Sequence, residues 1–228
     1  MSNQLALARL LQLCSANLPV GGFSFSQGLE QAVELGWVDS EQSSYDWCHT
    51  YLSQAMLKTD LPLLAAQFEA IQQANHQEFE LNEQWVRATR ESSELLMAEV
   101  AMGKAMLRLL LSLEDLKSSR HYVMAQRYSS LSLISSFALA ASLFELQQTD
   151  MLSGFAWTYI DNQIAAATKL VPLGQTQSQN LLFRLAALIP QCVANYQRSP
   201  AAELGQSLVG LSMASSWHEQ QYSRLFRS

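Results

Sequence analysis

Apolar residues recur every three or four positions along most of this chain, the spacing that puts them on one face of an α-helix. The clearest run is residues 96–110. Its apolar stripe consists of Leu96, Val100, Gly103, Leu107 and Leu110. Apolar and polar residues never alternate for more than a few positions, and no repeat period recurs, so neither a sheet nor a solenoid is expected. The pattern predicts an all-α protein.

Glycine, proline and capping residues divide the first third of this pattern into helices. Ser24 with Gln27, and Ser43 with Asp46, have the form of capping boxes, and Gly36 can take a left-handed C-terminal cap. The helices expected here span residues 5–15, 24–35, 39–57 and 60–74, the last with Pro62 in its first turn.

A long helix is expected to begin at Asn82, an N-cap residue with acidic Glu83 in the first turn. Two pairs of opposite charge four residues apart lie opposite its apolar stripe. They are Arg87 with Glu91 and Arg90 with Glu94. Such pairs stabilise a solvent-exposed helix face, so we expect all four side chains to face water.

The C-terminal half repeats the pattern over residues 121–147 and 150–170, where small residues such as Ala138, Ala140 and Ala141 allow helices to approach closely. The Pro172–Gly174 turn should end the second of these. Thr176 with Gln179 then suggests a capping box for a helix over 177–195, kinked at Pro190, and Ser199–Pro200 should open the last long helix. The expected fold is one bundle of about ten helices over residues 1–228.

Composition agrees with one helical domain and excludes several partners. Hydrophobic residues make up 49% of the 228 residues, while glycine and proline number only 9 and 5. The net charge is −6 and no basic stripe interleaves with aromatics, so nucleic acid is not an expected partner. The longest weakly polar stretch, Leu131–Phe144, is too short to cross about 30 Å of hydrocarbon, so no membrane partner is expected.

Signatures of catalysis or of metal and cofactor binding are missing from the sequence. Cys14, Cys48 and Cys192 lack the spacing of a zinc or redox motif and are expected to be buried cytosolic thiols. Asp46 and His49 form a lone pair with metal-ligand spacing, whose ordinary explanation is a hydrogen bond on a helix surface. Because catalytic, metal-binding and cofactor-binding residues are all expected to be absent, we predict a non-enzymatic cytoplasmic protein.

The segment 217–228 is unusually rich in aromatic and guanidinium groups for a chain terminus. Its three aromatics could bury roughly 450–750 Å², or about 11–19 kcal/mol. Ordering twelve residues costs on the order of 18 kcal/mol. The free energy gained by burial nearly equals the cost of ordering. This is compatible with a tail that becomes ordered on a partner, or with a tail that packs on its own bundle.

Four ordered groups of residues resemble the UreF family of urease accessory proteins. They are Leu10–Ser15 with Leu18–Glu30; Thr89–Glu91 with Glu94–Leu95 and Met102–Lys104; Lys169–Gln175 with Gln179; and His218–Glu219 with Gln221–Ser228. Residues 37–86 and 108–150 match this family only in helical texture.

The resemblance implies a dimeric helical protein that binds the accessory protein UreD, also called UreH. That complex is expected to recruit the GTPase UreG and to dock on urease apoprotein, so that nickel reaches the urease active site. The chain would then be a scaffold without chemistry of its own. A GTPase-activating regulator of UreG, using Arg224 or Arg227 as a finger, and an α-helical metalloenzyme remain alternatives.

The residues expected to bind partners come from the family motifs. They are Glu30, Lys169, Gly174, Gln175, Gln179, His218, Glu219, Tyr222, Arg224, Leu225, Phe226 and Arg227. Glu30 and Lys169 lie beside helix breaks, where their charges could steer a partner such as the GTPase or form intramolecular salt bridges.

Overall fold

The computed structural model describes residues 3–196, 205 and 208–227, and in this part of the chain it contains α-helices and short 3₁₀ and π segments but no strands. The α-helices are α1 (Asn3–Leu13), α2 (Leu29–Glu34), α3 (Glu41–Tyr51), α4 (Leu61–Gln72), α5 (His76–Ala88), α6 (Ser93–Ser112), α7 (Tyr122–Ala125), α8 (Leu133–Leu143), α9 (Gln148–Leu170), α10 (Gln175–Ala186), α11 (Ile189–Asn195) and α12 (Val209–His218). The predicted all-α bundle is confirmed. No described helix is long and apolar enough to cross a membrane.

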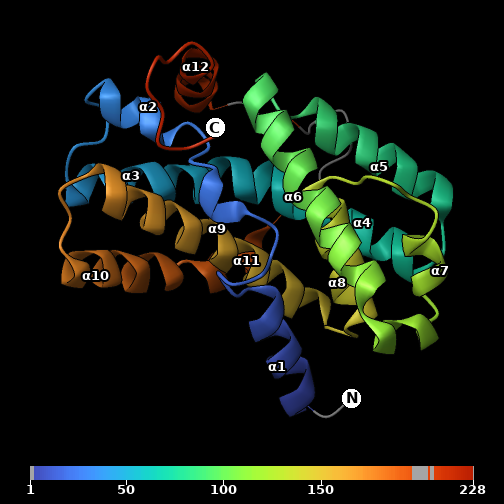
Figure 1. The fold of residues 1–228 in the computed structure, drawn as a ribbon. Helices are drawn as coiled ribbons and strands as arrows, with labels where there is room; N and C mark the ends of the chain where they lie inside the picture. Colours follow the sequence, from blue (N-terminus) through green and yellow to red (C-terminus); the bar gives the residue numbers. More distant parts are fainter. Residues whose placement is uncertain (1–2, 197–204, 206–207, 228) are drawn as a thin grey trace.

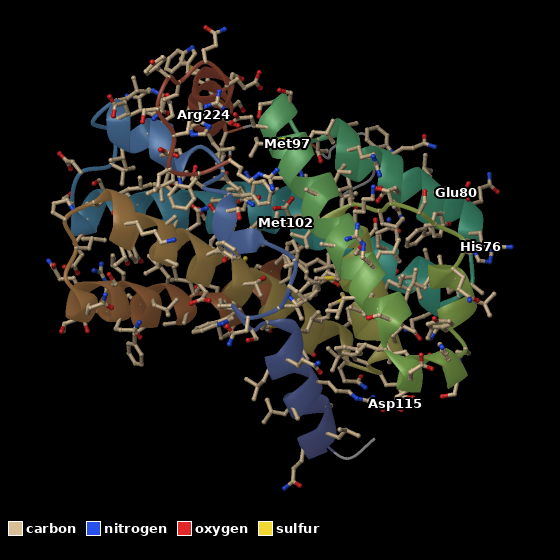
Figure 2. All side chains as sticks on the ribbon, in the orientation of Figure 1. His76, Glu80, Met97, Met102, Asp115 and Arg224 are labelled. Carbon is tan, nitrogen blue, oxygen red and sulfur yellow. The ribbon has the colours of Figure 1, made fainter. Side chains whose placement is uncertain are left out.

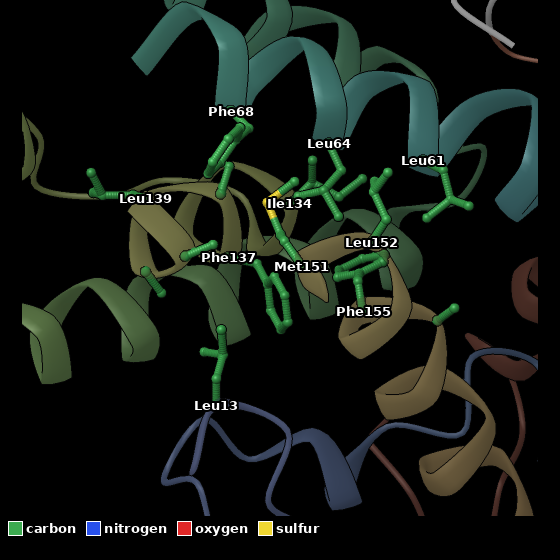
Figure 3. Packing of buried hydrophobic residues seen from close by; sticks show 14 of the residues in the cluster. Leu13, Leu61, Leu64, Phe68, Ile134, Phe137, Leu139, Met151, Leu152 and Phe155 are labelled. Carbon is green, nitrogen blue, oxygen red and sulfur yellow. The ribbon is translucent and has the colours of Figure 1, made fainter. Parts of the chain in front are cut away.

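Helix α8 is the centre of the main core and packs between α4 and α6 (Figure 1). Ten of its eleven residues are buried, which explains why its sequence is apolar or small all round rather than amphipathic. Phe137 contacts Phe155 of α9 edge-on, with ring centroids 5.2 Å apart. Figure 3 shows these rings among the leucines of α4 and α9.

Gly103 lets α6 and the start of α8 approach closely. A Cβ at this position would lie only 2.2 Å from the carbonyl oxygen of Leu131. The hydroxyl of Ser136 donates to the Gly103 carbonyl at 2.9 Å, which joins the two helices across the gap. A side chain here would therefore push α8 away from α6.

The second part of the bundle is built around α9, the longest helix of the described chain. Helices α3 and α10 lie along it, and α2 with α12 cover one of its ends (Figure 1). Helix α1 crosses α9 at Gly154, where a Cβ would lie 2.7 Å from the Cys14 sulfur, and then projects from the body. The contact between α12 and α2 places the C-terminal end of the chain beside its first quarter.

The two helices expected over residues 39–57 and 60–74 form one continuous helix. A π-helical segment, Leu52–Asp60, joins α3 to α4. The capping box lies at Ser40 and Ser43, so the proposed Ser43–Asp46 box was wrong. The Ser24–Gln27 box was also wrong, because residues 22–24 form a 3₁₀ turn and α2 begins after Gly28 at φ 85°.

The long helix expected from Asn82 is two helices. Asn75 caps α5 by accepting a hydrogen bond from the Glu78 amide at 3.2 Å, and Asn82 lies buried within that helix. The helix ends at Ala88, and Ser92 caps α6 through the Leu95 amide. This break removes the geometry needed for the predicted Arg–Glu pairs.

The C-terminal boundaries also differ from expectation. Helix α10 starts at Gln175, with the Gln177 side chain accepting from the Gly174 amide at 2.8 Å, so the Thr176–Gln179 box was wrong. Pro190 begins a separate helix, α11, because it lies in the first turn, where proline is tolerated. The helix expected over residues 121–147 is instead two helices, α7 and α8, and α8 begins after its N-cap Ser132. The start predicted at Ser199 lies outside the described residues.

Candidate functional site

Helix α12 and the segment after it, residues 219–227, close one end of the bundle, where Figure 2 places Arg224 near Met97 of α6. This segment has no regular secondary structure. It is held by side chains of α2 and α6 and by a backbone hydrogen bond to a distant part of the chain, from the Arg227 amide to the Ser24 carbonyl at 2.8 Å. We call residues 219–227 the C-terminal segment.

His218 is the fully buried centre of this attachment, with a relative exposure of 0%. Its Nδ1 lies 2.7 Å from Glu94 Oε2, and its Nε2 lies 3.1 Å from Glu30 Oε2. Each ring nitrogen of His218 thus lies within hydrogen-bond distance of a buried carboxyl group. His218 thereby links α12 to both α2 and α6.

Glu30 acts as a cap for the C-terminal segment as well as a partner of His218. Its two oxygens accept from the backbone amides of Leu225 at 2.6 Å and Phe226 at 2.9 Å. The side chain is 7% exposed. The buried Glu30 carboxylate therefore accepts the hydrogen bonds that these two amides would otherwise make in regular secondary structure.

Arg224 completes the charge balance of this cluster. Its guanidinium donates to Glu94 Oε1 at 2.8 Å and also to the carbonyls of Gln221 and Glu219. The carboxyl groups of Glu30 and Glu94 therefore face the imidazole of His218 and the guanidinium of Arg224. We call these four residues the buried charge cluster, in which Glu30, Glu94 and His218 are buried and Arg224, with its side chain 32% exposed, lies at the edge. Buried polar groups of this kind are stable only while their partners lie beside them, so the cluster favours the arrangement in which the C-terminal segment packs on α2 and α6.

Phe226 anchors the C-terminal segment in a small apolar core. It is 6% exposed and packs in a group with Leu29, Ala32, Val38, Ala166, Ala167, Val171 and Ala214. The ammonium of Lys169 lies 5.4 Å from the centre of its ring, a cation–π contact. Lys169 and Glu30 thus both contact the C-terminal segment, and the intramolecular contact expected as an alternative for Glu30 is made with His218.

Glu219 attaches the same segment to the start of α6. Its Oε1 accepts from the Ser93 amide at 3.1 Å and from the Ser93 hydroxyl at 2.5 Å, at the positive end of the helix dipole. Nearby, the hydroxyls of Ser92 and Ser215 lie 2.6 Å apart and are buried.

Other side chains of this end of the molecule point to solvent. Tyr222 is 105% exposed and Leu225 is 63% exposed. Trp217 and Trp37 pack against each other with ring centroids 5.9 Å apart, and each leaves more than two fifths of its surface exposed. Buried anchors and exposed aromatic groups therefore share one short stretch of chain.

The remaining sequence-predicted residues lie at the turn between α9 and α10. Gly174, Gln175 and Gln179 are exposed. Leu173, within the same turn, packs on the apolar group that holds Phe226. The turn is thus close to the Phe226 core, although its three named residues make no hydrogen bond to residues 219–227.

A second buried charged group was missed by the sequence patterns. Arg90 donates to Asp60 at 2.9 Å and to Glu99 at 3.1 Å, and Tyr51 donates to Asp60 at 2.5 Å. Burial opposes the charge of Arg90, but the two carboxylates outweigh it and raise its pKa well above the ordinary value. Burial raises the pKa of Glu99, and Arg90 offsets part of that rise.

The predicted Arg87–Glu91 and Arg90–Glu94 pairs are therefore wrong. Arg87 pairs with Glu83 at 2.7 Å, one turn earlier in α5. Arg90 is buried on Asp60 and Glu99, and Glu94 belongs to the buried charge cluster. The break between α5 and α6 turns Arg90 and Glu94 toward different partners.

No group of three or more His, Cys, Asp or Glu residues is arranged to hold a metal ion within the described ranges. Asp46 accepts from Gln42 at 2.9 Å, and His49 stacks on Tyr45 with centroids 5.7 Å apart. Both are surface interactions within α3.

Comparison with known proteins identifies the family. The family model described as UreF matches residues 38–186. Three relatives named urease accessory protein UreF match nearly the whole chain. The relative from Marinomonas sp. (strain MWYL1) is 43% identical over 100% of this chain and 96% of its own length. The relative from Teredinibacter turnerae (strain T7901) is 41% identical over 100% of both chains. The relative from Chromohalobacter salexigens (strain DSM 3043) is 40% identical over 98% of this chain and 95% of its own length.

The fold defines an all-α protein in which a buried charge cluster holds an aromatic C-terminal segment against the first helices. The chain belongs to the UreF family, whose matched relatives are named as accessory proteins of urease. The family model stops at residue 186, before the C-terminal segment, whereas the relatives match the chain through it.

Proposed function

We propose that this protein is a non-catalytic scaffold for the maturation of nickel-containing urease. It acts in the cytoplasm as a homodimer, binds UreD (UreH), recruits the GTPase UreG and docks with them on urease apoprotein. Nickel is the cargo of this assembly. Family membership supports the role, since its relatives are named urease accessory proteins.

One observation carries the assignment of the C-terminal segment as the UreD contact. Tyr222 and Leu225 are exposed on a segment whose neighbours Phe226 and His218 are buried. A segment that is already ordered loses little conformational entropy when it binds, and exposed tyrosine and arginine are side chains that dominate interface energies. Tyr222, Leu225 and Arg227 then contact the partner, while Glu30, His218, Arg224 and Phe226 hold the surface in shape.

We assign Lys169, Gly174, Gln175 and Gln179 to a second contact, with UreG. They lie on or beside an exposed turn between two helices, and Lys169 extends over the Phe226 ring. A cation at the rim of an interface steers association more than it adds affinity. Glu219 accepts a hydrogen bond from Ser93, so it stabilises the edge of the C-terminal segment that we assign to UreD binding.

The test is binding of UreD to the Tyr222→Ala/Leu225→Ala double variant. Both side chains are exposed, so the fold should persist while UreD affinity falls by roughly 10- to 100-fold. Removal of residues 217–228 is a poorer test, because it would leave the buried carboxyl groups of Glu30 and Glu94 without their hydrogen-bond partners.

The matched control is Phe183→Ala, which removes an 81% exposed ring from α10. UreD binding by this variant should equal that of the wild type. Unchanged UreD affinity in the double variant would reject the assignment of the C-terminal segment. Lower nickel content of urease from cells carrying the double variant would connect the contact to maturation.

Activation of the UreG GTPase is a second proposal, in which Arg227 contacts UreG instead of UreD. Arg224 is engaged by Glu94 and two carbonyls, whereas the Arg227 side chain is exposed and makes no hydrogen bond or ion pair with any described residue. A free guanidinium can stabilise developing phosphoryl charge. Single-turnover GTP hydrolysis by UreG should then accelerate with the wild-type chain but not with Arg227→Ala, and equal rates would reject this role.

A further inference from the structure

A cavity of about 710 Å³ lies at the end of the molecule opposite the C-terminal segment. It is lined by the end of α4, by the turn between α8 and α9, and by residues 118–121, which precede α7. Figure 2 places Asp115, just before residues 118–121, far from Arg224. The volume lies within the range of about 300–1,000 Å³ that is typical of small-molecule sites.

The wall of this cavity is polar and carries charges of both signs. Only Phe68 and Leu146 among its lining residues are apolar. Arg120 contributes a cation, and Glu69 and Glu145 contribute carboxylates. An apolar ligand would cover these groups without pairing them, and a simple anion or cation would meet groups of its own charge. We call this site the polar cavity.

Hydrogen bonds between the elements hold part of this wall in place. The Gln72 carboxamide donates to the Ser142 hydroxyl at 3.2 Å and accepts from Arg120 Nη2 at 3.0 Å. It thereby joins α4 both to α8 and to the segment before α7. The Gln148 carboxamide donates to Glu69 at 3.3 Å and joins α9 to α4. A wall that is fixed before a ligand arrives loses little conformational entropy on binding.

His121 contributes a neutral ring with one proton to donate. Arg120 Nε lies 3.0 Å from His121 Nε2. Because a guanidinium only donates, Nε2 accepts and Nδ1 carries the ring proton. Burial and the charge of Arg120 lower the pKa of His121, which keeps the ring neutral near neutral pH. No residue of the described chain accepts a hydrogen bond from Nδ1, so this proton is left for a ligand.

Three further polar groups of the wall make no hydrogen bond or ion pair with the residues that the structure describes. They are Nη1 of Arg120, the carboxylate of Glu145 and the carboxamide of Gln147. The charge of Glu145 reaches His121, where it partly offsets the lowering of the pKa. Glu145 follows α8 with φ 56°, a conformation in which glycine is usual, so this carboxylate is held here at a cost in backbone strain.

We propose that the polar cavity binds a free α-amino acid with a polar side chain. The ligand carboxylate accepts from Arg120 Nη1 and His121 Nδ1, the ligand ammonium donates to Glu145, and the ligand side chain pairs with Gln147. Each charge of the zwitterion then meets an opposite charge. The site goes beyond the proposed scaffold role, because it takes a small molecule and lies away from the C-terminal segment.

The test is isothermal titration calorimetry of the full chain with L-glutamine, whose side chain matches the carboxamide of Gln147. The dissociation constant should be about 1 mM or lower. Glutaramic acid lacks the ammonium and γ-aminobutyramide lacks the carboxylate, and each should bind at least roughly 10-fold more weakly. Arg120→Gln should weaken L-glutamine binding by roughly 10-fold or more. Arg108→Gln, which removes an exposed arginine from α6, is the control and should bind like the wild type.

Glu145→Gln gives a result that loss of folding cannot imitate. This variant loses the partner of the ammonium and also the charge that repels a carboxylate. It should therefore bind L-glutamine more weakly than the wild type does, yet bind glutaramic acid at least as well. The proposal is overturned if L-glutamine gives no binding up to about 10 mM. Equal affinity for the three compounds, or unchanged L-glutamine binding by Arg120→Gln, would also overturn it.

Discussion

Glu94 Oε2 lies 2.7 Å from Nδ1 of His218, although the two residues are 124 positions apart in the chain. The contact joins the first turn of α6 to the last residue of α12. Both side chains are almost completely buried. The order of the C-terminal segment therefore depends on a buried polar contact as well as on apolar area.

His218→Ala should loosen the C-terminal segment. Without the imidazole, the buried carboxyl groups of Glu30 and Glu94 each lose a hydrogen-bond partner, a loss of about 1–3 kcal/mol or more. Hydrogen exchange at the Leu225 and Phe226 amides should accelerate, because their acceptor is Glu30. Tyr222→Ala is the control, since its fully exposed side chain should leave the exchange unchanged. Equal protection in both variants would show that His218 does not hold the segment.

Gly103→Ala should destabilise the main core. Its new Cβ would lie 2.2 Å from the Leu131 carbonyl oxygen, and backbone cannot move aside as a side-chain end can. Overpacking of this kind costs about 1–3 kcal/mol or more, measurable as a lower midpoint of urea unfolding. Gly210→Ala is the control in α12, where the nearest atom to a new Cβ is 3.9 Å away. That variant should be as stable as the wild type or slightly more stable.

Arg90→Met should cost much more stability than Arg87→Met. Arg90 is the only cation bonded to Asp60 and Glu99 in the described chain, and breaking this buried pairing costs about 3–5 kcal/mol. The Arg87 side chain is 37% exposed and pairs within one helix, an interaction worth about 0.3–0.5 kcal/mol. Chemical denaturation of the two variants measures the difference. Similar losses would mean that water already screens Arg90.

The three cysteines should react slowly in the folded protein. Burial raises the pKa of Cys14 and Cys48 from 9.0 to about 12 and that of Cys192 to about 11. The thiolate is the reactive form, so at pH 8 labelling by iodoacetamide should be roughly 100- to 1,000-fold slower than in guanidinium. A thiol that labels rapidly in the native state would show local opening.

These shifts also fix a pH dependence of stability. Because the folded pKa values lie above the unfolded value of 9.0, the thiols stabilise the fold below pH 9. That contribution is lost as the pH rises from about 9 toward 12. Urea unfolding of the wild type and of Cys48→Ala, compared at pH 8 and pH 10, measures it: the wild type should lose more stability than the variant.

The helical fold could be predicted from the sequence because its signals are local. The apolar spacing from Leu96 to Leu110 and the small residues of α8 depend on the period of a helix, and both helices are confirmed. Of the predicted stripe Gly103, Leu107 and Leu110 are buried, whereas Leu96 and Val100 are only partly buried. Gly36 adopts φ 70°, as its position after α2 predicted. Several starts were wrong because two neighbouring residues, such as Ser40 and Ser43, can each form a cap, and only tertiary packing selects between them.

The candidate site could be predicted only in part. Family resemblance singled out Glu30, His218 and Arg224, but not that they meet in one buried cluster. The estimate of near-zero stability for the C-terminal segment omitted Glu30, which lies 195 residues before Leu225. Arg90 was placed on the surface for the same reason. A buried ion pair between distant residues leaves no periodic signal in the sequence.

The π-helical segment Leu52–Asp60 restricts changes in chain length. Residues nine apart lie on opposite sides of an α-helix, yet the wider turns of the π segment bring Asp60 round to within 2.5 Å of the Tyr51 hydroxyl. Deleting one residue there would rotate α4 by about 100° relative to α3 and separate this pair. Natural relatives should therefore vary in length in their loops and keep the residue count between Tyr51 and Asp60 constant.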